Sequence, residues 1–440
     1  MIRKIIGLAI PNIISNITIP LVGMVDLAIV GAMGSTVMLG GIAIGTAIFN
    51  LLYWNFGFLR MGTSGLTAQA YGRRDFVEIQ RVLMRSLSVA TAIAALILLF
   101  QVPLVKLILR FMDTTPPIEL AAREYFTFRV WAAPATLGLY AFKGWLIGMQ
   151  NSRSPMWIAI FINVVNVVAS LVLAFPCGMG LAGVALGTTI AQWSGVGLAL
   201  FVVARYYGRY FDLHRLFDGV FQAQALALFF RLNRDIFIRT LCLVAVFTYF
   251  TKASSSMGPV TLAANTLLMQ LFTIFSYFMD GFAYAGEALA GRYTGSRNMA
   301  RLRGSVVAIF KVGGVVSLFF SVIYFFVGRY ILLIFSPSAD VLARALSSMV
   351  YVALVPVVGF SAFLLDGLLV GMTQSRVMRN SMLVATALFF GLYFALDDIL
   401  GTGALWLAFL SYLLARAGFQ LLMMRPFTRK NNRKSQPKKK

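Results

Sequence analysis

The chain has a single histidine, His214, and only two cysteines, Cys177 and Cys242, among its 440 residues. Two cysteines exclude a disulfide framework, and a histidine-based triad or a histidine-liganded zinc site would depend on one side chain. The sequence also lacks the GxxxxGK[ST] phosphate loop of ATP-driven pumps. We therefore expect neither an enzyme nor a metal or cofactor site. Transport by this chain would use an ion gradient or passive flow, unless another subunit supplied a motor.

Charged residues are also scarce, at 12% of the chain, whereas 60% of the residues are apolar. A helix crosses the hydrocarbon layer, about 30 Å thick, with about 20 apolar residues. The sequence contains twelve such stretches, so we predict an all-α integral membrane protein with twelve transmembrane helices. The predicted spans are 5–31, 38–70, 80–110, 120–150, 155–176, 181–206, 231–257, 261–292, 302–335, 341–373, 378–398 and 402–424.

Two segments repeat one pattern: GWLIGMQNSR begins at Gly144 and GLLVGMTQSR begins at Gly367, an offset of 223 residues (367 − 144). The same offset relates LGGIAIGTAIF, which begins at Leu39, to LAANTLLMQLF, which begins at Leu262. Solenoid repeats run to about 20–50 residues, so this period indicates two domain-sized halves. Six spans per half would leave both halves in the same orientation. We predict two parallel six-helix bundles related by a pseudo-two-fold axis along the membrane normal.

The domain organisation follows from the spans. We predict an N-terminal bundle at 1–206, a cytoplasmic linker at 207–230, a C-terminal bundle at 231–424 and a basic cytoplasmic tail at 425–440. The linker mixes charged and aromatic residues, which is typical of a segment at the membrane surface.

Positive charge falls almost completely on alternate loops, and such charge near helix ends is retained in the cytoplasm. The basic loops contain Arg73, Arg153, Arg205, Arg297 and Arg376. The opposite loops carry Asp113, Glu119, Asp340, Asp397 and Asp398. We therefore expect a multi-pass membrane protein with both termini in the cytoplasm. The net charge of +23 is spread over loops, unlike the basic surface of a nucleic-acid-binding protein. Membrane lipids are the expected contact of the tail, and nucleic acid is not.

Asp26 interrupts the apolar stretch PLVGMVDLAIVG in the first span. A charge at the bilayer centre costs at least about 2.5–3.5 kcal/mol, so such a residue indicates function or pairing. Asn16 lies on the same segment, and Arg60 of the second span is a candidate partner. A buried carboxyl group that is paired intermittently can bind and release a proton, because burial disfavours its ionised form and a cation favours it. The alternative is a structural carboxylate held by a cation.

A second polar cluster lies on the predicted span 261–292. Tyr277, Asp280, Tyr284 and Glu287 follow spacings of three, four and three residues, so they form one stripe of a helix. Two acids and two aromatic rings facing a cavity would suit a cationic amphipathic substrate. Alternatively, a neighbouring Lys252 or Arg239 could bridge the acids.

Asp366 is the fourth carboxylate within an apolar stretch, and we include it in the candidate substrate cavity. Its counterpart at the 223-residue offset is Lys143, so an ion pair between the halves is one interpretation.

The glycine spacings Gly144-x-x-x-Gly148 and Gly367-x-x-x-Gly371 are typical of closely packed membrane helices. We predict that they serve packing.

Several motifs together resemble a known family. They are VDLAIVG, FLRMGTSGLTAQAYG, LNRDIFIR, DGFAYAGEA and LLDGLLVGMTQSRVMRNSM. The chain resembles the multidrug and toxic compound extrusion (MATE) family over nearly its whole length, and in particular the DinF-like (DNA-damage-inducible protein F) bacterial branch. The resemblance implies a V-shaped pair of bundles that exports drugs, usually cationic, by alternating access in exchange for H⁺ or Na⁺. It also implies that Asp26 is the ion-coupling acid and that the membrane is the bacterial cytoplasmic (inner) membrane.

One position departs from the family pattern. In related sequences an Asn is followed four residues later by an Asp, whereas this chain has Asn166 and Ser170. With one carboxylate fewer, a sodium site is disfavoured and proton coupling through Asp26 is favoured, with Asn163 as a further polar contact. The predicted function is proton-coupled efflux of organic cations by a monomer. The alternatives are a Na⁺-coupled drug antiporter and a lipid-linked precursor flippase, which Arg60, Arg129 and Lys143 would favour.

Overall fold

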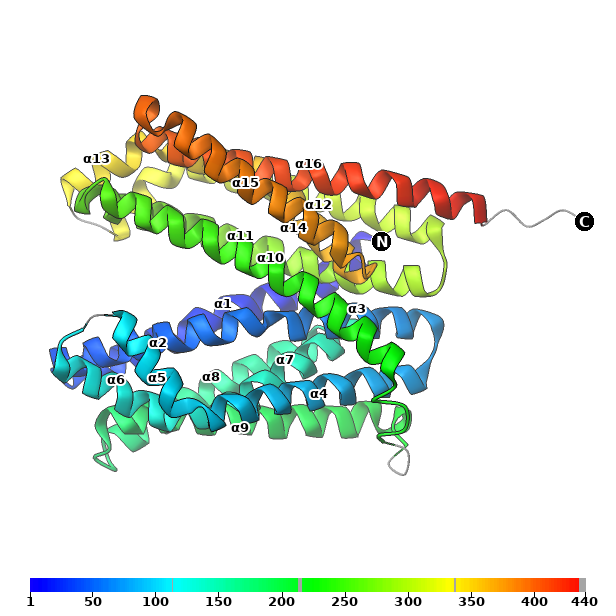
Figure 1. The fold of residues 1–440 in the computed structure, drawn as a ribbon, viewed down its shortest axis with the longest axis horizontal. Coiled ribbons are helices and arrows are strands. Elements are labelled where there is room, and N and C mark those ends of the chain that lie inside the picture. Colours follow the sequence, from blue (N-terminus) through cyan, green and yellow to red (C-terminus); the bar gives the residue numbers. More distant parts are fainter. Residues whose placement is uncertain (113, 213–215, 336–337, 435–440) are drawn as a thin grey trace, which may run out of the picture. The chain divides into compact units, whose positions relative to one another are not determined.

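The computed structural model describes residues 1–112, 114–212, 216–335 and 338–434. Asp113, His214 and the last part of the expected tail, residues 435–440, lie outside the described residues. The described chain folds into helices (Figure 1). They are α1 (Ile2–Ala32), α2 (Thr36–Trp54), η1 (Asn55–Gly57), α3 (Phe58–Arg73), α4 (Phe76–Leu99), α5 (Gln101–Met112), α6 (Pro116–Arg129), η2 (Val130–Ala132), α7 (Ala133–Gly148), α8 (Arg153–Ala174), α9 (Gly180–Tyr207), η3 (Gly208–Tyr210), α10 (Ala223–Ser256), α11 (Pro259–Gly295), α12 (Met299–Phe335), α13 (Ala339–Ser347), α14 (Met349–Gly371), α15 (Ser375–Leu400) and α16 (Thr402–Lys434).

Eleven helices of the described chain are long and apolar enough to cross a membrane. The predicted span 120–150 is not among these eleven and is divided into α6, η2 and α7, of 14, 3 and 16 residues. Three other predicted spans are also divided: 38–70 into α2, η1 and α3, 80–110 into α4 and α5, and 341–373 into α13 and α14. Pro134 lies in the first turn of α7, where a missing backbone N–H is tolerated. The α6 helix ends before that turn, so the stretch is not one continuous helix.

The outer faces of these helices carry large apolar side chains that are exposed. Val315, Phe326 and Ile334 of α12 are 70%, 70% and 82% exposed. Soluble proteins rarely expose contiguous apolar surface on this scale. A lipid environment removes the penalty, since the side chains then face hydrocarbon.

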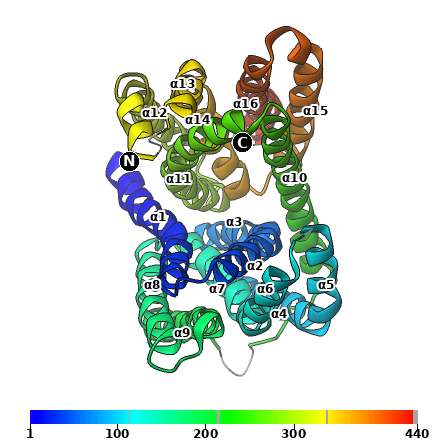
Figure 2. The same cartoon turned by 90° about the vertical axis from the view of Figure 1, so that its left-hand side faces the viewer.

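The chain divides into two compact units. The first comprises residues 1–9, 234–290 and 298–440, and the second comprises residues 10–233 and 291–297. Within each unit the long helices run side by side, and an end-on view shows them as a bundle (Figures 1 and 2). The segment that follows α9 is held by α4 of the same unit, because Arg85 donates 2.9 Å to the Val220 carbonyl and Gln80 bonds with the backbone of Asp212.

The duplication read from the sequence is repeated in the packing of the helices. In one half α8 packs on α9, and at the offset of 223 residues α15 packs on α16. A Cβ atom placed on Gly144 would lie 2.3 Å from the Arg60 carbonyl oxygen, and one on Gly367 would lie 2.1 Å from that of Ala283. Residues 60 and 283 differ by the same offset. Both glycine motifs therefore allow close backbone packing, as predicted.

A polar contact is also duplicated. Asn12 of α1 donates 2.9 Å to the hydroxyl of Ser152, the residue that directly precedes α8. At the same offset, the hydroxyl of Ser375 donates 2.8 Å to Asp235 of α10. In this second contact the residue on the first helix, Asp235, is charged, and Arg379 pairs with it at 2.8 Å. The two halves thus tie their first helix to the start of their fifth in the same way, with an amide in one and an ion pair in the other.

Candidate functional site

Asp26 lies on α1, and its side chain is buried, with 1% of the residue exposed. The hydroxyl of Thr188, on α9, donates 3.1 Å to Oδ2 of the carboxylate. Within the described part of the chain, the other oxygen, Oδ1, has no hydrogen-bond partner. A buried polar atom without a partner is uncommon. This oxygen can therefore accept a proton or one more hydrogen bond.

A chain of polar side chains extends from Asp26 across the second unit. Asn166 of α8 donates 3.0 Å to Thr188 and 3.4 Å to Ser170, and Ser170 donates 3.4 Å to the Val184 carbonyl. The Asn166 side chain also lies close enough to the Asp26 carboxylate to stabilise its ionised form. Its Oδ1 has no hydrogen-bond partner among the described residues. The structure thus brings together Asp26, Asn166 and Ser170, with Thr188 as the link.

The Thr188 hydroxyl can adapt to the protonation state of Asp26, since it has one hydrogen and two acceptors within reach. It lies 3.1 Å from Asp26 and also 3.1 Å from the Val184 carbonyl. An ionised Asp26 can only accept, so the hydroxyl then points to it. A protonated Asp26 can donate to Thr188, which is then free to donate to Val184. Both protonation states of Asp26 can therefore be satisfied without moving a helix.

The cation whose charge acts on Asp26 is Arg129, at the end of α6, rather than the Arg60 suggested by the sequence. Arg129 donates to the hydroxyl of Tyr125 and lies over the rings of Phe49 and Tyr125, at 5.0 and 5.3 Å from their centroids. Among the described residues, no cation lies within 4.0 Å of Asp26. Aromatic contacts hold the guanidinium near the acid without forming an ion pair.

The remaining residues predicted around Asp26 lie in the same unit. Asn163 donates 3.1 Å to the backbone carbonyl of Thr18 and so joins α8 to α1. Asn16 is buried, with 3% of the residue exposed. Arg60 is 9% exposed, and its positive charge interacts with Tyr140. None of these three residues contributes to the hydrogen bonds or ion pairs of Asp26.

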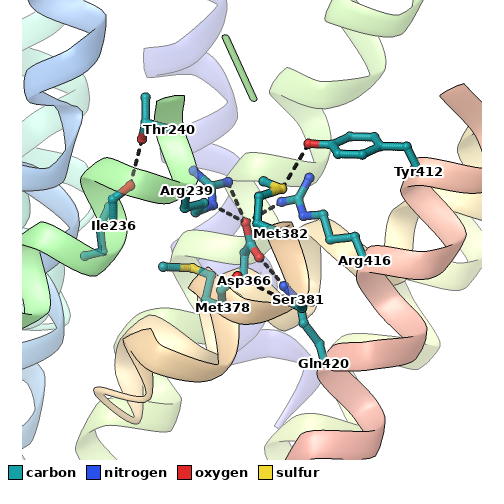
Figure 3. A network of polar contacts seen from close by, with 10 residues as sticks. All are labelled: Ile236, Arg239, Thr240, Asp366, Met378, Ser381, Met382, Tyr412, Arg416 and Gln420. Carbon is teal, nitrogen blue, oxygen red and sulfur yellow. Dashed lines mark hydrogen bonds and ion pairs between the residues drawn. The ribbon is translucent and has the colours of Figure 1, made fainter. Parts of the chain in front are cut away.

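Asp366, of the other unit, lies in a network of four polar side chains (Figure 3). Arg239 of α10 pairs with it at 2.5 Å, Arg416 of α16 pairs with the same oxygen, and Gln420 donates 2.6 Å to the other oxygen. Arg416 also lies over the Phe363 ring, 5.5 Å from its centroid. Two cations and an amide thus satisfy both oxygens of Asp366, and its ion pairs lie within its own unit.

The predicted stripe on α11 is partly accessible. Tyr277, Asp280 and Tyr284 are half-buried, whereas Glu287 is 1% exposed. The negative charge of Asp280 lies close enough to Tyr277 and to Arg416 for an electrostatic interaction with each. The stripe therefore lies next to the Asp366 network. Lys252, one of the two suggested bridging cations, is exposed, and the other, Arg239, is paired with Asp366.

Comparison with known proteins gives consistent matches. The profile of the MatE family matches residues 11–172 and 236–396. The chain is 36% identical over 417 residues to DNA damage-inducible protein F of Escherichia coli (strain K12), covering 94% of this chain and 90% of that protein. It is 25% identical over 319 residues to the probable multidrug resistance protein NorM of Rhizobium meliloti (strain 1021), covering 71% and 67% of the two chains. A crystal structure of MATE in the bent conformation has a TM-score of 0.90 at 17% identity, over 98% of this chain and 96% of that chain.

The membrane-length helices and the family match together define a multi-pass membrane protein that is a transporter. The chain belongs to the MATE family of transporters and is homologous to DNA damage-inducible protein F and to the NorM proteins. The family inferred from the sequence motifs, the all-helical membrane fold and the assignment as a transporter rather than an enzyme are thereby confirmed.

Proposed function

We propose that the protein exports organic, mostly cationic or amphipathic compounds in exchange for H⁺, and that Asp26 is the acid that carries the proton. The observation that carries this proposal is a buried carboxylate whose second oxygen has no partner in the described chain. A proton on that oxygen would neutralise a charge that is costly in the bilayer. Because the Thr188 hydroxyl can donate to the ionised acid or accept from the protonated acid, the same site can hold Asp26 in both states.

Proton coupling is favoured over sodium coupling by the ligands around Asp26. Sodium, like other hard cations, would need several oxygen ligands with negative charge nearby. Here Ser170 occupies the position of the second family acid, and its hydroxyl donates to the Val184 carbonyl. Arg129 adds positive charge near Asp26. Both features disfavour a bound metal cation and leave a proton as the better partner of Asp26.

The substrate class follows from the α11 stripe. Asp280 is an acid that is half-buried, and Tyr277 and Tyr284 flank it with aromatic rings. An acid between two rings can hold a flat organic cation by charge attraction and cation–π contact. NorM of Rhizobium meliloti is named a probable multidrug resistance protein, which agrees with a substrate of this kind.

We further propose that the protein is a monomer in the bacterial inner membrane with both termini in the cytoplasm. Six spans in 1–206 and six in 231–424 would place the linker at 207–230 and the tail at 425–440 on the basic, cytoplasmic side. The bacterial homologue, DNA damage-inducible protein F, supports this location.

The test is transport in proteoliposomes that hold a pH gradient, with ethidium as the organic cation. Wild type and Asp26→Asn are compared with Asp75→Asn as the matched control. Asp75 accepts a hydrogen bond from the Glu78 backbone N–H at the start of α4, and Asn caps a helix as well as Asp does. Each protein is measured without sodium and then with it.

We expect ethidium to dissipate the pH gradient with wild type and Asp75→Asn in the absence of sodium, and at least about tenfold more slowly with Asp26→Asn, since loss of a positioned proton-transfer group costs about 10²–10⁴-fold in rate. Full coupling by Asp26→Asn would refute the role of Asp26. Transport that requires sodium would replace proton exchange with sodium exchange. Ethidium transport by none of the three folded proteins would favour the flippase alternative.

A further inference from the structure

An open groove of about 630 Å³ lies between the start of α1 and the first turns of α12. Both segments belong to the same unit, and Figure 2 shows the start of α1 beside α12. The groove is separate from Asp26 and from the α11 stripe. Its lining is unusual because it combines several cations with apolar side chains.

Three of the residues that line the groove are basic: Arg3, Arg303 and Lys311. All three are exposed. Arg303 and Lys311 are eight residues apart, which places them about 80° apart around α12 and about 12 Å apart along its axis. None of the described lining residues is acidic. The start of α12 adds partial positive charge from its backbone N–H groups.

The rest of the lining is apolar. Ile2 is 50% exposed and Val307 is 54% exposed. Gly304 directly follows Arg303 and also lines the groove. A Cβ atom placed on Gly304 would meet no atom within 4 Å, so the groove is open at this position. An apolar strip therefore runs along α12 between the two cations. Free phosphate would use the cations only, whereas a ligand with an anionic head and a hydrocarbon chain would use both.

We propose that this groove binds one anionic phospholipid of the membrane. Its phosphate lies between Arg3 and Arg303, and an acyl chain follows Ile2 and Val307. Lys311, which is deeper along α12, extends its long stem back toward the head group. Basic pockets between membrane helices on the cytoplasmic side bind anionic head groups in this way. The proposal does not depend on what the protein transports.

Native mass spectrometry of the purified full-length protein, titrated with phosphatidylglycerol or phosphatidylcholine, tests the site. The first variant is the triple change Arg3→Gln, Arg303→Gln and Lys311→Gln. Its control removes three exposed cations from the other unit, Arg73→Gln, Arg153→Gln and Arg205→Gln. The second variant, Gly304→Phe, fills the groove and keeps all three cations. Melting curves in phosphatidylcholine check that each variant is folded.

Each cation near an anionic lipid contributes a factor of about five in affinity, so the triple variant is expected to bind phosphatidylglycerol on the order of 100-fold more weakly than wild type. The control triple variant should retain the tight phosphatidylglycerol adduct, and Gly304→Phe should lose it. Excess inorganic phosphate should not displace the adduct.

Equal phosphatidylglycerol binding by the two triple variants would overturn the proposal, as would an equally tight phosphatidylcholine adduct in wild type. Displacement by inorganic phosphate would show an anion site without lipid specificity and would also overturn it. Retention of the adduct by a folded Gly304→Phe would place the lipid elsewhere.

Discussion

Asp26 and Asp366 are both buried carboxylates on membrane helices, but their surroundings differ. Asp366 is held by Arg239, Arg416 and Gln420, which together engage both oxygens. Asp26 has one hydroxyl donor and one oxygen without a partner in the described chain. A carboxylate between two guanidinium groups stays ionised and serves structure. A carboxylate with an unpaired oxygen can change its protonation state, which is what coupling requires.

Replacing Asp366 with Asn should destabilise the protein severely. The change leaves the Arg416 side chain, which is 3% exposed, as a buried charge without its counter-ion. Breaking a buried ion pair from one side costs about 3–5 kcal/mol. Thermal unfolding in detergent measures the effect, and Asp75→Asn is the matched control. If Asp366→Asn melted at the temperature of the control, the structural role of this network would be wrong.

At this scale the sequence predicts the acids but not their partners. Asp26 stands out because a carboxylate in an apolar stretch is costly. Thr188 is separated from Asp26 by 162 residues. A threonine in a membrane helix does not by itself indicate a functional contact. Arg129 lies within the predicted span 120–150, and nothing in the sequence indicates that its charge acts on Asp26 in place of that of Arg60.

At the scale of helices, apolar length predicts most spans because the bilayer imposes it directly. Four predicted spans, 38–70, 80–110, 120–150 and 341–373, are each divided into shorter helices. Pro134, in the first turn of α7, is the sequence signal for the break within 120–150. The repeated glycine motifs were interpretable from the sequence since their spacing places small residues on one face. Their contact partners, the carbonyls of Arg60 and Ala283, came only from the structure.

Gly367→Ala should disrupt the packing of α14 against α11, because the new methyl group would lie 2.1 Å from the Ala283 carbonyl oxygen. Overpacking of this kind costs about 1–3 kcal/mol. Gly418→Ala of α16 is the control, since a Cβ atom there meets nothing within 4 Å and Ala favours the helix by up to about 1 kcal/mol. Melting temperatures should fall for Gly367→Ala and stay equal or rise for Gly418→Ala. Equal melting of the two variants would contradict the packing role.

At the scale of the whole molecule, the distribution of charge predicts how the chain is oriented in the membrane. Arg153 begins α8 and Cys177 follows its end. The helix has 22 residues, which corresponds to about 33 Å. The two residues should therefore lie on opposite sides of the membrane, with Arg153 in the cytoplasm.

Cysteine labelling in intact cells tests this orientation. Cys177 is exposed, so a membrane-impermeant maleimide should label it from outside in a Cys242→Ala background. A cysteine introduced by Arg153→Cys, in a background with Cys177→Ser and Cys242→Ala, should react only after the cells are permeabilised. The opposite pattern would invert the predicted topology.

The most direct test of proton exchange at Asp26 is proton release on substrate binding. Ethidium is added to purified protein in weakly buffered detergent solution, and bound cation and released protons are measured together. Binding and proton release are linked reciprocally, so wild type and Asp75→Asn should release about one proton per bound cation, whereas Asp26→Asn should bind without release. The same release from Asp26→Asn as from wild type would show that another group carries the proton.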